Sequence, residues 1–150
     1  MNKKIYLGAD HAGFYLKDKL KQWLSKEQIA HQDLGNIIYD SKDDYPDFAE
    51  KVAVKVVEEK TLGILVCGSA QGVCIAANKI KGARAVIPFS LKETRLAREH
   101  NDANILCLSG WYTHLHWAKK MIKIFLSTEF SKEARHVRRV YKIRKLEAKR

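Results

Sequence analysis

Apolar runs that predict strands alternate with helical patterns along the whole chain, and this alternation constrains the fold more than any other feature. Residues 62–67 (Leu-Gly-Ile-Leu-Val-Cys) are almost wholly apolar, as in a strand with both faces covered. Four further strand-like runs span residues 5–8, 29–34, 83–87 and 104–108. Strands that alternate with helices form parallel crossover units, so the sequence predicts an α/β fold with a five-stranded parallel sheet between helical layers.

Helical patterns fill the segments between these runs. Leu16, Leu20 and Leu24 recur at the spacing of one helix face. Pro46 suits the first turn of a second helix, whose apolar stripe lies within residues 49–57. The remaining helical segments are residues 73–79, 91–100, 118–126 and 132–148. Because no linker, repeat or low-complexity stretch interrupts the pattern, we expect residues 1–150 to form a single domain.

Composition excludes several classes of protein. With 46% hydrophobic residues, two Pro and eight Gly in 150 positions, the chain is neither disordered nor collagen-like. No apolar run approaches the roughly 20 residues of a membrane span, and the N-terminus lacks the layout of a signal peptide. Cys67, Cys74 and Cys107 form an odd set without a CxxC pair, which argues against a disulfide framework or zinc knuckle and indicates a cytoplasmic protein.

Basic charge is concentrated at the C-terminus. The formal net charge is +11, and residues 132–150 contribute +7 through nine basic and two acidic side chains. Helical spacing places four of the basic side chains on one face: Arg135, Arg138, Arg139 and Lys142. The other side carries Val137, Val140 and Tyr141. Such a basic face can grip a phosphate with paired guanidinium groups or contact nucleic acid, although a merely solvated face is more common.

Polar residues follow the first predicted strand, at the edge of the sheet where ligands of open parallel sheets bind. The segment Gly-Ala-Asp-His-Ala-Gly (residues 8–13) places Asp10 and His11 together between strand and helix. A carboxylate and an imidazole at this point are candidates for a functional site. Asp10 fits an ordinary helix N-cap equally well, so both interpretations stay open.

A glycine-containing loop follows the third predicted strand. Residues 67–72 read Cys-Gly-Ser-Ala-Gln-Gly and precede a helix, so backbone N–H groups and a helix N-terminus can converge on a phosphate or an enediolate oxygen. The loop lacks the Gly-Lys-Ser/Thr of a Walker A motif and the three glycines of a dinucleotide site. Cys67 stands at the start of this loop, where the helix N-terminus is expected to lower the pKa of the thiol and make it a base or nucleophile. The alternative interpretation is that Cys67 is only a small, buried apolar residue.

His100 ends a predicted helix just before the fifth strand. A histidine there can act as a general base near neutral pH. It can equally be a helix C-terminal residue that interacts with the helix dipole, and this segment alone slightly favours that simpler interpretation.

Six short motifs occur in one order along the chain. They are Gly-Ala-Asp-His-Ala-Gly-Phe (8–14), Asp-Tyr-Pro (44–46), Cys-Gly-Ser-Ala-Gln-Gly (67–72), Ile-Ala-Ala-Asn-Lys (75–79), His-Asn-Asp-Ala-Asn (100–104) and Arg-His-Val-Arg-Arg-Val (135–140). Each motif alone is weak, but six in register are a strong signal. Over residues 3–143 the chain closely resembles the ribose-5-phosphate isomerase B family, which includes galactose-6-phosphate and allose-6-phosphate isomerases.

The resemblance implies a Rossmann-like α/β/α sandwich and a homodimer, with a tetramer left open, whose active sites are shared between subunits. It implies conversion of ribose 5-phosphate to ribulose 5-phosphate through an enediolate, in the pentose phosphate pathway, without metal or cofactor. Neither a membrane nor a nucleic acid is then expected as a partner.

The resemblance also assigns roles to individual residues. Cys67 matches the base that moves a proton between C2 and C1, and Ser69 matches the hydroxyl that assists it. His100 matches the residue that opens the furanose ring, with Asp10 assisting at the ring oxygen. The loop that would hold the enediolate oxygen comprises Gly68, Ala70, Gln71 and Gly72. The other matched contacts are Asn101 at the sugar and His11, Arg135 and Arg139 at the phosphate.

Three positions depart from the family pattern. Val73 stands where another branch has Glu, which places this chain in the Cys-using branch. Ala70 stands where Gly is common. Trp111 stands where the family usually has a phosphate-binding Arg from the partner subunit. The phosphate clamp is therefore weaker, is completed by another residue such as His114, or fits a different substrate.

Three other functions follow from these departures and from the charge. The first is isomerisation of a six-carbon aldose phosphate of the allose 6-phosphate type. The second is an inactive isomerase scaffold, suggested by Trp111. The third is a nucleic-acid-binding module that uses the basic C-terminal helix, but it leaves Asp10, Cys67 and His100 without a role.

Overall fold

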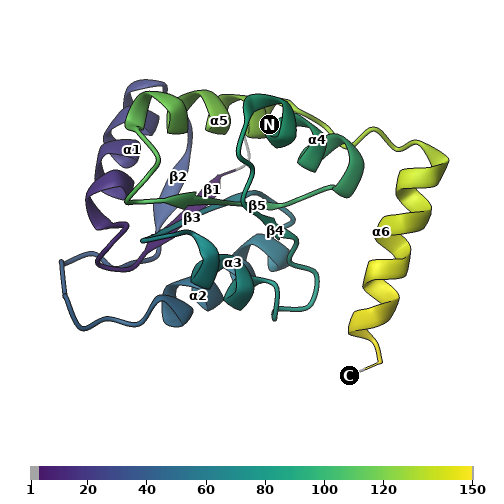
Figure 1. Cartoon of the computed structure of the whole chain (residues 1–150), viewed down its shortest axis with the longest axis horizontal. Helices are drawn as coiled ribbons and strands as arrows, with labels where there is room; N and C mark the ends of the chain where they lie inside the picture. Colours follow the sequence, from purple (N-terminus) through teal and green to yellow (C-terminus); the bar gives the residue numbers. More distant parts are fainter. Residues whose placement is uncertain (1–3, 150) are drawn as a thin grey trace.

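The computed structural model describes residues 4–149, and in this part of the chain five strands form one sheet flanked by six helices (Figure 1). The strands are β1 (Ile5–Ala9), β2 (His31–Asp33), β3 (Gly63–Cys67), β4 (Ala85–Val86) and β5 (Ile105–Ser109). The helices are α1 (Phe14–Lys26), α2 (Tyr45–Glu58), α3 (Gln71–Ala77), α4 (Leu91–Asn101), α5 (Leu115–Ser127) and α6 (Ala134–Glu147). The predicted α/β sandwich with a five-stranded parallel sheet is confirmed.

The strand order determines where the site lies. All pairs are parallel and the order is β2-β1-β3-β5-β4. Strand β2 therefore lies next to β1 on one edge, whereas β3 lies next to β1 on the opposite edge, so the chain reverses its direction across the sheet at β1. Crevices at such a switch in direction, at the carboxyl ends of the strands, are where ligands bind in open α/β sheets. The segments that follow β1 and β3 carry the predicted site residues.

Two helical layers bury the two faces of the sheet. Helices α1, α4 and α5 cover one face, and α2 and α3 cover the other (Figure 1). Strands β1, β3 and β5 are buried along their whole length. The predicted apolar stripe of α1 supplies the fully buried Leu20 and Leu24, and Pro46 lies in the first turn of α2 as expected.

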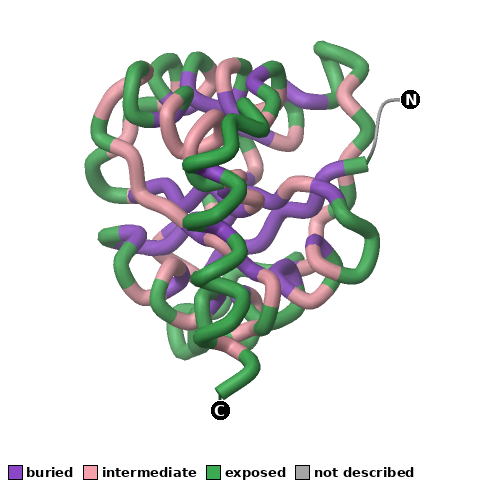
Figure 2. Tube along the Cα trace, turned by 90° about the vertical axis from the view of Figure 1, so that its right-hand side faces the viewer, coloured by how far each residue is buried: buried purple, intermediate pink, exposed green. Residues whose placement is uncertain are grey.

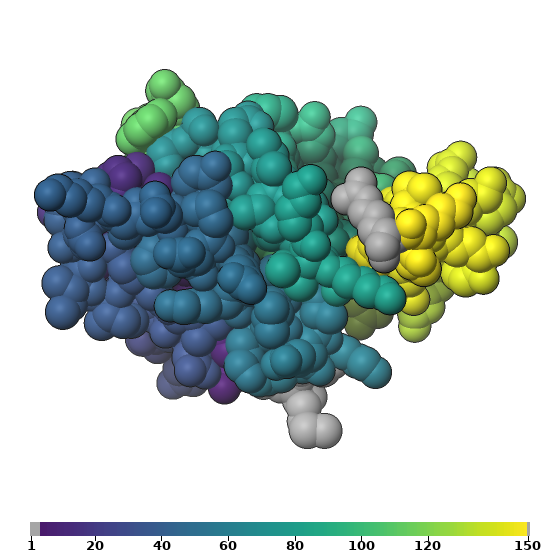
Figure 3. All heavy atoms as spheres, turned by 90° about the horizontal axis from the view of Figure 1, so that it is seen from below, coloured from purple at the N-terminus to yellow at the C-terminus, as the bar shows by residue number. Residues whose placement is uncertain are grey.

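Helix α6 lies outside these layers, beyond the β4 edge of the sheet (Figure 1). Viewed from that side, it crosses from the α4 layer toward the α3 layer with most of its residues exposed (Figure 2). Only His136 and Val140 are buried, and near its end Glu147 Oε1 accepts a hydrogen bond from the Gly82 N–H. Seen from below, α6 forms a ridge at the side of the molecule (Figure 3). The basic helix predicted over 132–148 is thus present but packs weakly on its own chain.

Local differences from the sequence prediction have physical causes. The strand predicted over 83–87 is only Ala85–Val86, because Pro88 follows and the segment pairs with β5 alone at the sheet edge. Lys17 is 1% exposed although it lies among charged positions of α1, because Asp33 and the Asn36 carbonyl accept hydrogen bonds from its Nζ. The single-domain prediction covered residues 1–150, and positions 1–3 and 150 lie outside the described residues.

No helix within residues 4–149 combines the length and the hydropathy needed to cross a bilayer.

Candidate active site

The Cys67 sulfur lies at the carboxyl end of β3, directly before the loop of residues 68–70. Backbone N–H groups of Ala70, Gly72 and Val73 face it and favour its thiolate form. These amides converge because the chain turns sharply at Ala70, which has a left-handed φ of 69° and is the N-cap of α3. The left-handed conformation explains why glycine suits this position. A sulfur at a nest of amides is suited to proton transfer beside an oxyanion.

The environment of Cys67 does not lower its pKa as expected from the sequence. Burial raises the pKa of the thiol, since Cys67 is only 4% exposed, and the nearby Asp10 carboxylate raises it further. The amides of Val73, Ala70 and Gly72 act in the opposite direction but do not outweigh burial. The expectation of a lowered pKa was wrong, because position at a helix N-terminus says nothing about desolvation.

Ser69 and Gln71 project from the same loop into solvent. Both side chains are exposed, and Ser69 Oγ accepts a hydrogen bond from the Gln71 N–H at 3.4 Å. Since the other residues of the loop are mostly buried, these two are the loop's free polar groups at the surface above Cys67.

Two aromatic rings border the loop. A Cβ atom on Gly68 would lie 2.5 Å from the Trp111 ring, and one on Gly72 would lie 2.6 Å from the Tyr45 ring. Trp111 also donates a backbone hydrogen bond to the Gly68 carbonyl at 3.2 Å. The rings remain 66% and 41% exposed, respectively. The Trp111 ring therefore packs against the loop of residues 68–70 in its own chain.

Asp10 lies beside Cys67, after the neighbouring strand β1. Its Oδ1 accepts a hydrogen bond from the Gly13 N–H at 3.0 Å, which closes the turn before α1. The N-cap residue of α1 is Gly13, so the interpretation of Asp10 as the N-cap was wrong. Burial raises the pKa of this carboxyl, with the Gly13 hydrogen bond opposing the shift. A carboxyl that holds its proton more tightly than usual can donate one, so the hydrogen bond in the turn and a chemical role are compatible for Asp10.

His11 is paired with a residue that the sequence analysis did not identify. Asp43 Oδ1 accepts hydrogen bonds from the His11 backbone N–H at 2.9 Å and from its Nδ1 at 2.7 Å. This pair raises the pKa of His11, and Asp10 adds to the effect. Ligand atoms of Asp10, His11 and Asp43 lie within 4.8 Å of one another, a spacing that a metal ion could also use. The direct His11–Asp43 hydrogen bond already satisfies two of these atoms.

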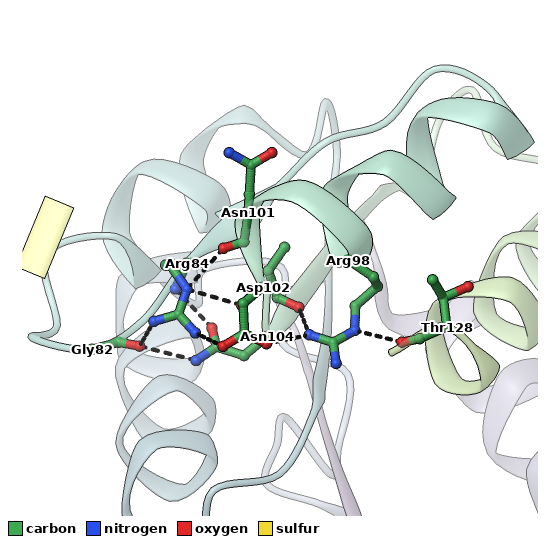
Figure 4. A network of polar contacts seen from close by, with 8 residues as sticks. Gly82, Arg84, Arg98, Asn101, Asp102, Asn104 and Thr128 are labelled. Atoms are coloured by element: carbon green, nitrogen blue, oxygen red, sulfur yellow. Dashed lines mark hydrogen bonds and ion pairs between the residues drawn. The ribbon is translucent and has the colours of Figure 1, made fainter. Parts of the chain in front are cut away.

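His100 and Asn101 lie elsewhere, at the C-terminal end of α4. A polar network fixes this end of the helix (Figure 4). Arg84 donates to the Asn101 and Asp102 carbonyls and pairs with the Asp102 carboxylate at 2.7 Å, and Arg98 pairs with the same carboxylate at 3.1 Å. The Asn101 side chain points away from this network (Figure 4). It is therefore free for a contact outside its own chain.

The imidazole of His100 packs at a tilt against that of His136, a residue to which the sequence analysis gave no role. The ring centroids of His100 and His136 are 4.1 Å apart. His136 is 2% exposed, and Ser131 Oγ lies 2.8 Å from its Nδ1. Burial lowers the pKa of His136, and the neighbouring His100 lowers it further. The contacts of the buried His136 with His100 and Ser131 thus hold α6 against the end of α4.

Arg135 and Arg139 project from α6 into solvent. Arg135 pairs with the exposed Glu133 at 2.9 Å, an interaction of little energetic weight. Arg139 is exposed and makes no ion pair within residues 4–149. Val137 and Tyr141, expected on the apolar side, are also 46% and 55% exposed. Both the basic and part of the apolar surface of α6 are therefore uncovered.

One chain does not bring these groups together. Cys67 pairs with Ser109 at the carboxyl end of the sheet, whereas α4 ends at Asn101, just before Ile105 at the amino end. A strand of this length separates the two ends by about 13 Å. We call the first set, Asp10, His11 and residues 67–72, the strand half-site. The second set, comprising His100, Asn101, Arg135 and Arg139, is the helix half-site.

A cleft of about 1260 Å³ opens at the amino end of the sheet. Arg84, Arg98, Asp102 and Arg144 are among its lining residues. It includes neither Cys67 nor the loop that follows it, so it does not connect the two half-sites.

Sequence reasoning missed Asp43, His136 and the packing of Trp111 on the loop. Asp43 lies in the long segment between β2 and α2, where no periodicity signals a contact with His11. The sequence did offer one signal, which is position relative to the motifs: Asp43 directly precedes the Asp-Tyr-Pro motif, and His136 lies within the motif of residues 135–140.

Comparisons with known proteins agree with this architecture. Residues 5–143 match the ribose/galactose isomerase family. A probable ribose-5-phosphate isomerase B of Mycoplasma genitalium is 43% identical over 145 residues, which is 95% of each chain.

Solved structures give the same result. The ribose-5-phosphate isomerase B of Mycoplasma genitalium, crystallised with ribulose-5-phosphate, superposes with a TM-score of 0.92 at 42% identity, covering 98% of this chain and 97% of that one. The enzyme from Clostridium thermocellum gives 0.93 at 40% identity, covering 98% and 99%. With the fold, the motif order and the matched length in agreement, this chain belongs to the ribose/galactose isomerase family of aldose–ketose isomerases.

Proposed function

We propose that the protein interconverts ribose 5-phosphate and ribulose 5-phosphate. The observation that carries the proposal is the Cys67 sulfur facing the amides of Ala70, Gly72 and Val73. Removal of a proton from the carbon next to an aldehyde needs a base and a stabilised oxyanion, and these groups supply both. The ribulose-5-phosphate bound to the Mycoplasma genitalium relative supports this choice of substrate.

The reaction begins with ring opening. The bond between C1 and the ring oxygen breaks, the ring oxygen gains a proton, and the C1 hydroxyl loses one. We assign the proton donor to Asp10, whose raised pKa favours the protonated carboxyl, and the acceptor to His100. The product is the open-chain aldehyde.

Isomerisation then moves one proton between carbons. The Cys67 thiolate takes the proton from C2, and the charge that develops on the C1 oxygen is stabilised by the loop amides. The Cys67 thiol returns the proton to C1 while the O2 hydroxyl proton moves to O1, assisted by Ser69. The aldehyde at C1 thereby becomes a CH2OH group, and the carbon that carried the C2 hydroxyl becomes a ketone.

The phosphate supplies binding energy remote from the reacting carbons. His11 lies next to Asp10, and its raised pKa keeps it cationic to higher pH than an ordinary histidine. Arg135 and Arg139 are exposed guanidinium groups, suited to bidentate contact with phosphate oxygens.

A homodimer would unite the two half-sites. In a two-fold dimer, the helix half-site of one copy can meet the strand half-site of its partner, and the reverse contact completes the second site. The exposed Val137 and Tyr141 on α6 are surfaces that such a partner would cover. Tetramer formation and a cytoplasmic location stay predictions.

The test is an isomerase assay with purified protein in the presence of a chelator. Ribose 5-phosphate is compared with allose 6-phosphate and other aldose phosphates, and ketose formation is followed. We expect the highest kcat/KM with ribose 5-phosphate, lost in Cys67→Ala. A higher kcat/KM with a six-carbon sugar would replace the substrate, and no turnover with any of them would contradict the proposal.

A further inference from the structure

The carboxylate of Asp43, in the loop between β2 and α2, accepts three hydrogen bonds. Its Oδ1 accepts from the His11 backbone N–H at 2.9 Å and from His11 Nδ1 at 2.7 Å, and its Oδ2 accepts from Asn36 Nδ2. Because a carboxylate only accepts, Nδ1 must carry the proton that it shares with Asp43. The other imidazole nitrogen, Nε2, takes no part in this contact.

Asp43 is itself held in place. Its side chain is 8% exposed and Asn36 is also 8% exposed. The Asn36 carbonyl accepts a hydrogen bond from Lys17, whose ammonium also pairs with Asp33 at 2.7 Å. A continuous set of buried polar contacts therefore runs from α1 to the imidazole of His11. Such a set fixes a ring orientation better than one exposed contact would.

Three carboxylates of the same chain act on the charge of His11. Asp10, Asp40 and Asp43 each favour the protonated imidazole, and Asp43 has the largest effect through its hydrogen bond. A phosphate monoester is mostly dianionic above about pH 6, where an ordinary histidine is losing its proton. A histidine that contacts such a ligand benefits from a partner that keeps it charged.

We propose that Asp43 is a positioning residue for the substrate phosphate, because it orients the His11 imidazole so that Nε2–H is directed at the phosphate oxygens. The proposal rests on the proposed function. Asp43 does not touch the substrate and acts only through His11. Its assignment gives the loop between β2 and α2 a role in binding sugar phosphates.

The direct test uses Asp43→Asn, which keeps the shape of the side chain and removes its charge. NMR titration of the His11 ring should show its midpoint moving to lower pH. Inorganic phosphate should bind about tenfold more weakly at neutral pH, the loss typical of a hydrogen bond to a charged group. For ribose 5-phosphate, KM should rise by a similar factor with kcat changing less than KM.

A structural role alone would not give the expected pH dependence. Phosphate affinity of Asp43→Asn should return toward that of the wild type as the pH falls and His11 becomes protonated again. Asp40→Asn is the matched control, since Asp40 lies in the same loop but does not bond His11. It should change the titration and the phosphate affinity much less. Equal effects of both variants, or a deficit that persists at low pH, would overturn the proposal.

The wild-type protein provides a second test that needs no variant to fold. Nitrogen chemical shifts of neutral His11 should place its proton on Nδ1, and an Nε2–H tautomer would overturn the proposal. These readouts and phosphate binding do not require turnover. Failure of the isomerase assay would therefore refute the proposed function, whereas an unmoved His11 midpoint in Asp43→Asn would refute this inference alone.

Discussion

The strand half-site is held from within its own chain. The loop amides face Cys67, the Gly13 N–H donates a hydrogen bond to Asp10, and Asp43 fixes His11. In the helix half-site, by contrast, the network around Asp102 fixes only the end of α4, and the guanidinium groups of α6 are solvated. The difference fits the proposed dimer: each monomer holds the proton-transfer groups around Cys67 in place, whereas His100 and the phosphate-binding arginines would complete the site only when a second copy supplies α4 and α6.

The largest effect on catalysis should come from the strand half-site. Cys67→Ala should lower kcat by about 10³-fold, the typical contribution of a positioned general base. Cys74→Ala is the control, because Cys74 lies in the same layer, near Cys107, and has no assigned role. Steady-state kinetics with ribose 5-phosphate measure both. Turnover by Cys67→Ala within tenfold of the wild type would remove Cys67 as the base.

The free energy of unfolding should respond strongly to close backbone packing beside the strand half-site. A Cβ on Gly13 would lie 2.3 Å from the Val66 carbonyl oxygen, so Gly13→Ala should lower the free energy of unfolding by more than about 3 kcal/mol. Urea denaturation measures this loss.

Gly68→Ala is the paired control for that substitution. Its added Cβ meets the exposed Trp111 ring, which can move, so the fold should survive with altered tryptophan fluorescence. If both variants lost the same free energy of unfolding, the Trp111 ring would be unable to move away from the added Cβ, and the prediction would be wrong.

Substitutions in the helix half-site should affect binding more than chemistry. Replacing both Arg135 and Arg139 with Ala should raise KM on the order of 100-fold and change kcat less, since two charged hydrogen-bonding groups are lost. Arg95→Ala removes an equally exposed charge from α4 and should change KM little. A kcat loss larger than the KM change would place these arginines at the reacting atoms instead.

The exposed apolar side chains of α6 should matter only between chains. Tyr141→Ser should leave the melting of dilute monomer nearly unchanged and weaken the dimer about tenfold, because the ring is 55% exposed in one chain. Sedimentation at several concentrations measures the association. A monomer that loses stability to the same extent would show that Tyr141 packs on its own chain.

The smallest effect concerns pH. Because the folded-state pKa of Cys67 is raised, the thiolate fraction and kcat should keep increasing with pH beyond the range of an ordinary thiol. By linkage, the folded state holds this proton more tightly, so the associated stability is present at low pH and is lost as pH rises through the folded-state value. Rate profiles in a Cys74→Ala background, compared with unfolding at each pH, measure both. If kcat instead rose with a midpoint at lower pH than the titration of a free thiol, the role of burial would be contradicted.

Sequence patterns predicted the parallel sheet well because its strands are buried on both faces and carry apolar runs, as in β3. They also predicted that polar residues would gather at the carboxyl ends of the strands, and Cys67 and Asp10 lie at the ends of the neighbouring strands β3 and β1. They could not identify the burial of Lys17 or the Asp43–His11 contact, since both depend on where an irregular segment lies. The pKa direction of Cys67 was predicted wrongly because burial is a tertiary property.

Complementation between two inactive variants tests most directly that each site is shared between copies. Cys67→Ala and His100→Ala chains are purified, mixed under conditions that exchange subunits, and assayed for ketose formation. If the half-sites come from different copies, each mixed dimer contains one intact site, and activity should recover to roughly a quarter of the wild type. If both half-sites come from one chain, the mixture will show no more activity than its two components measured separately.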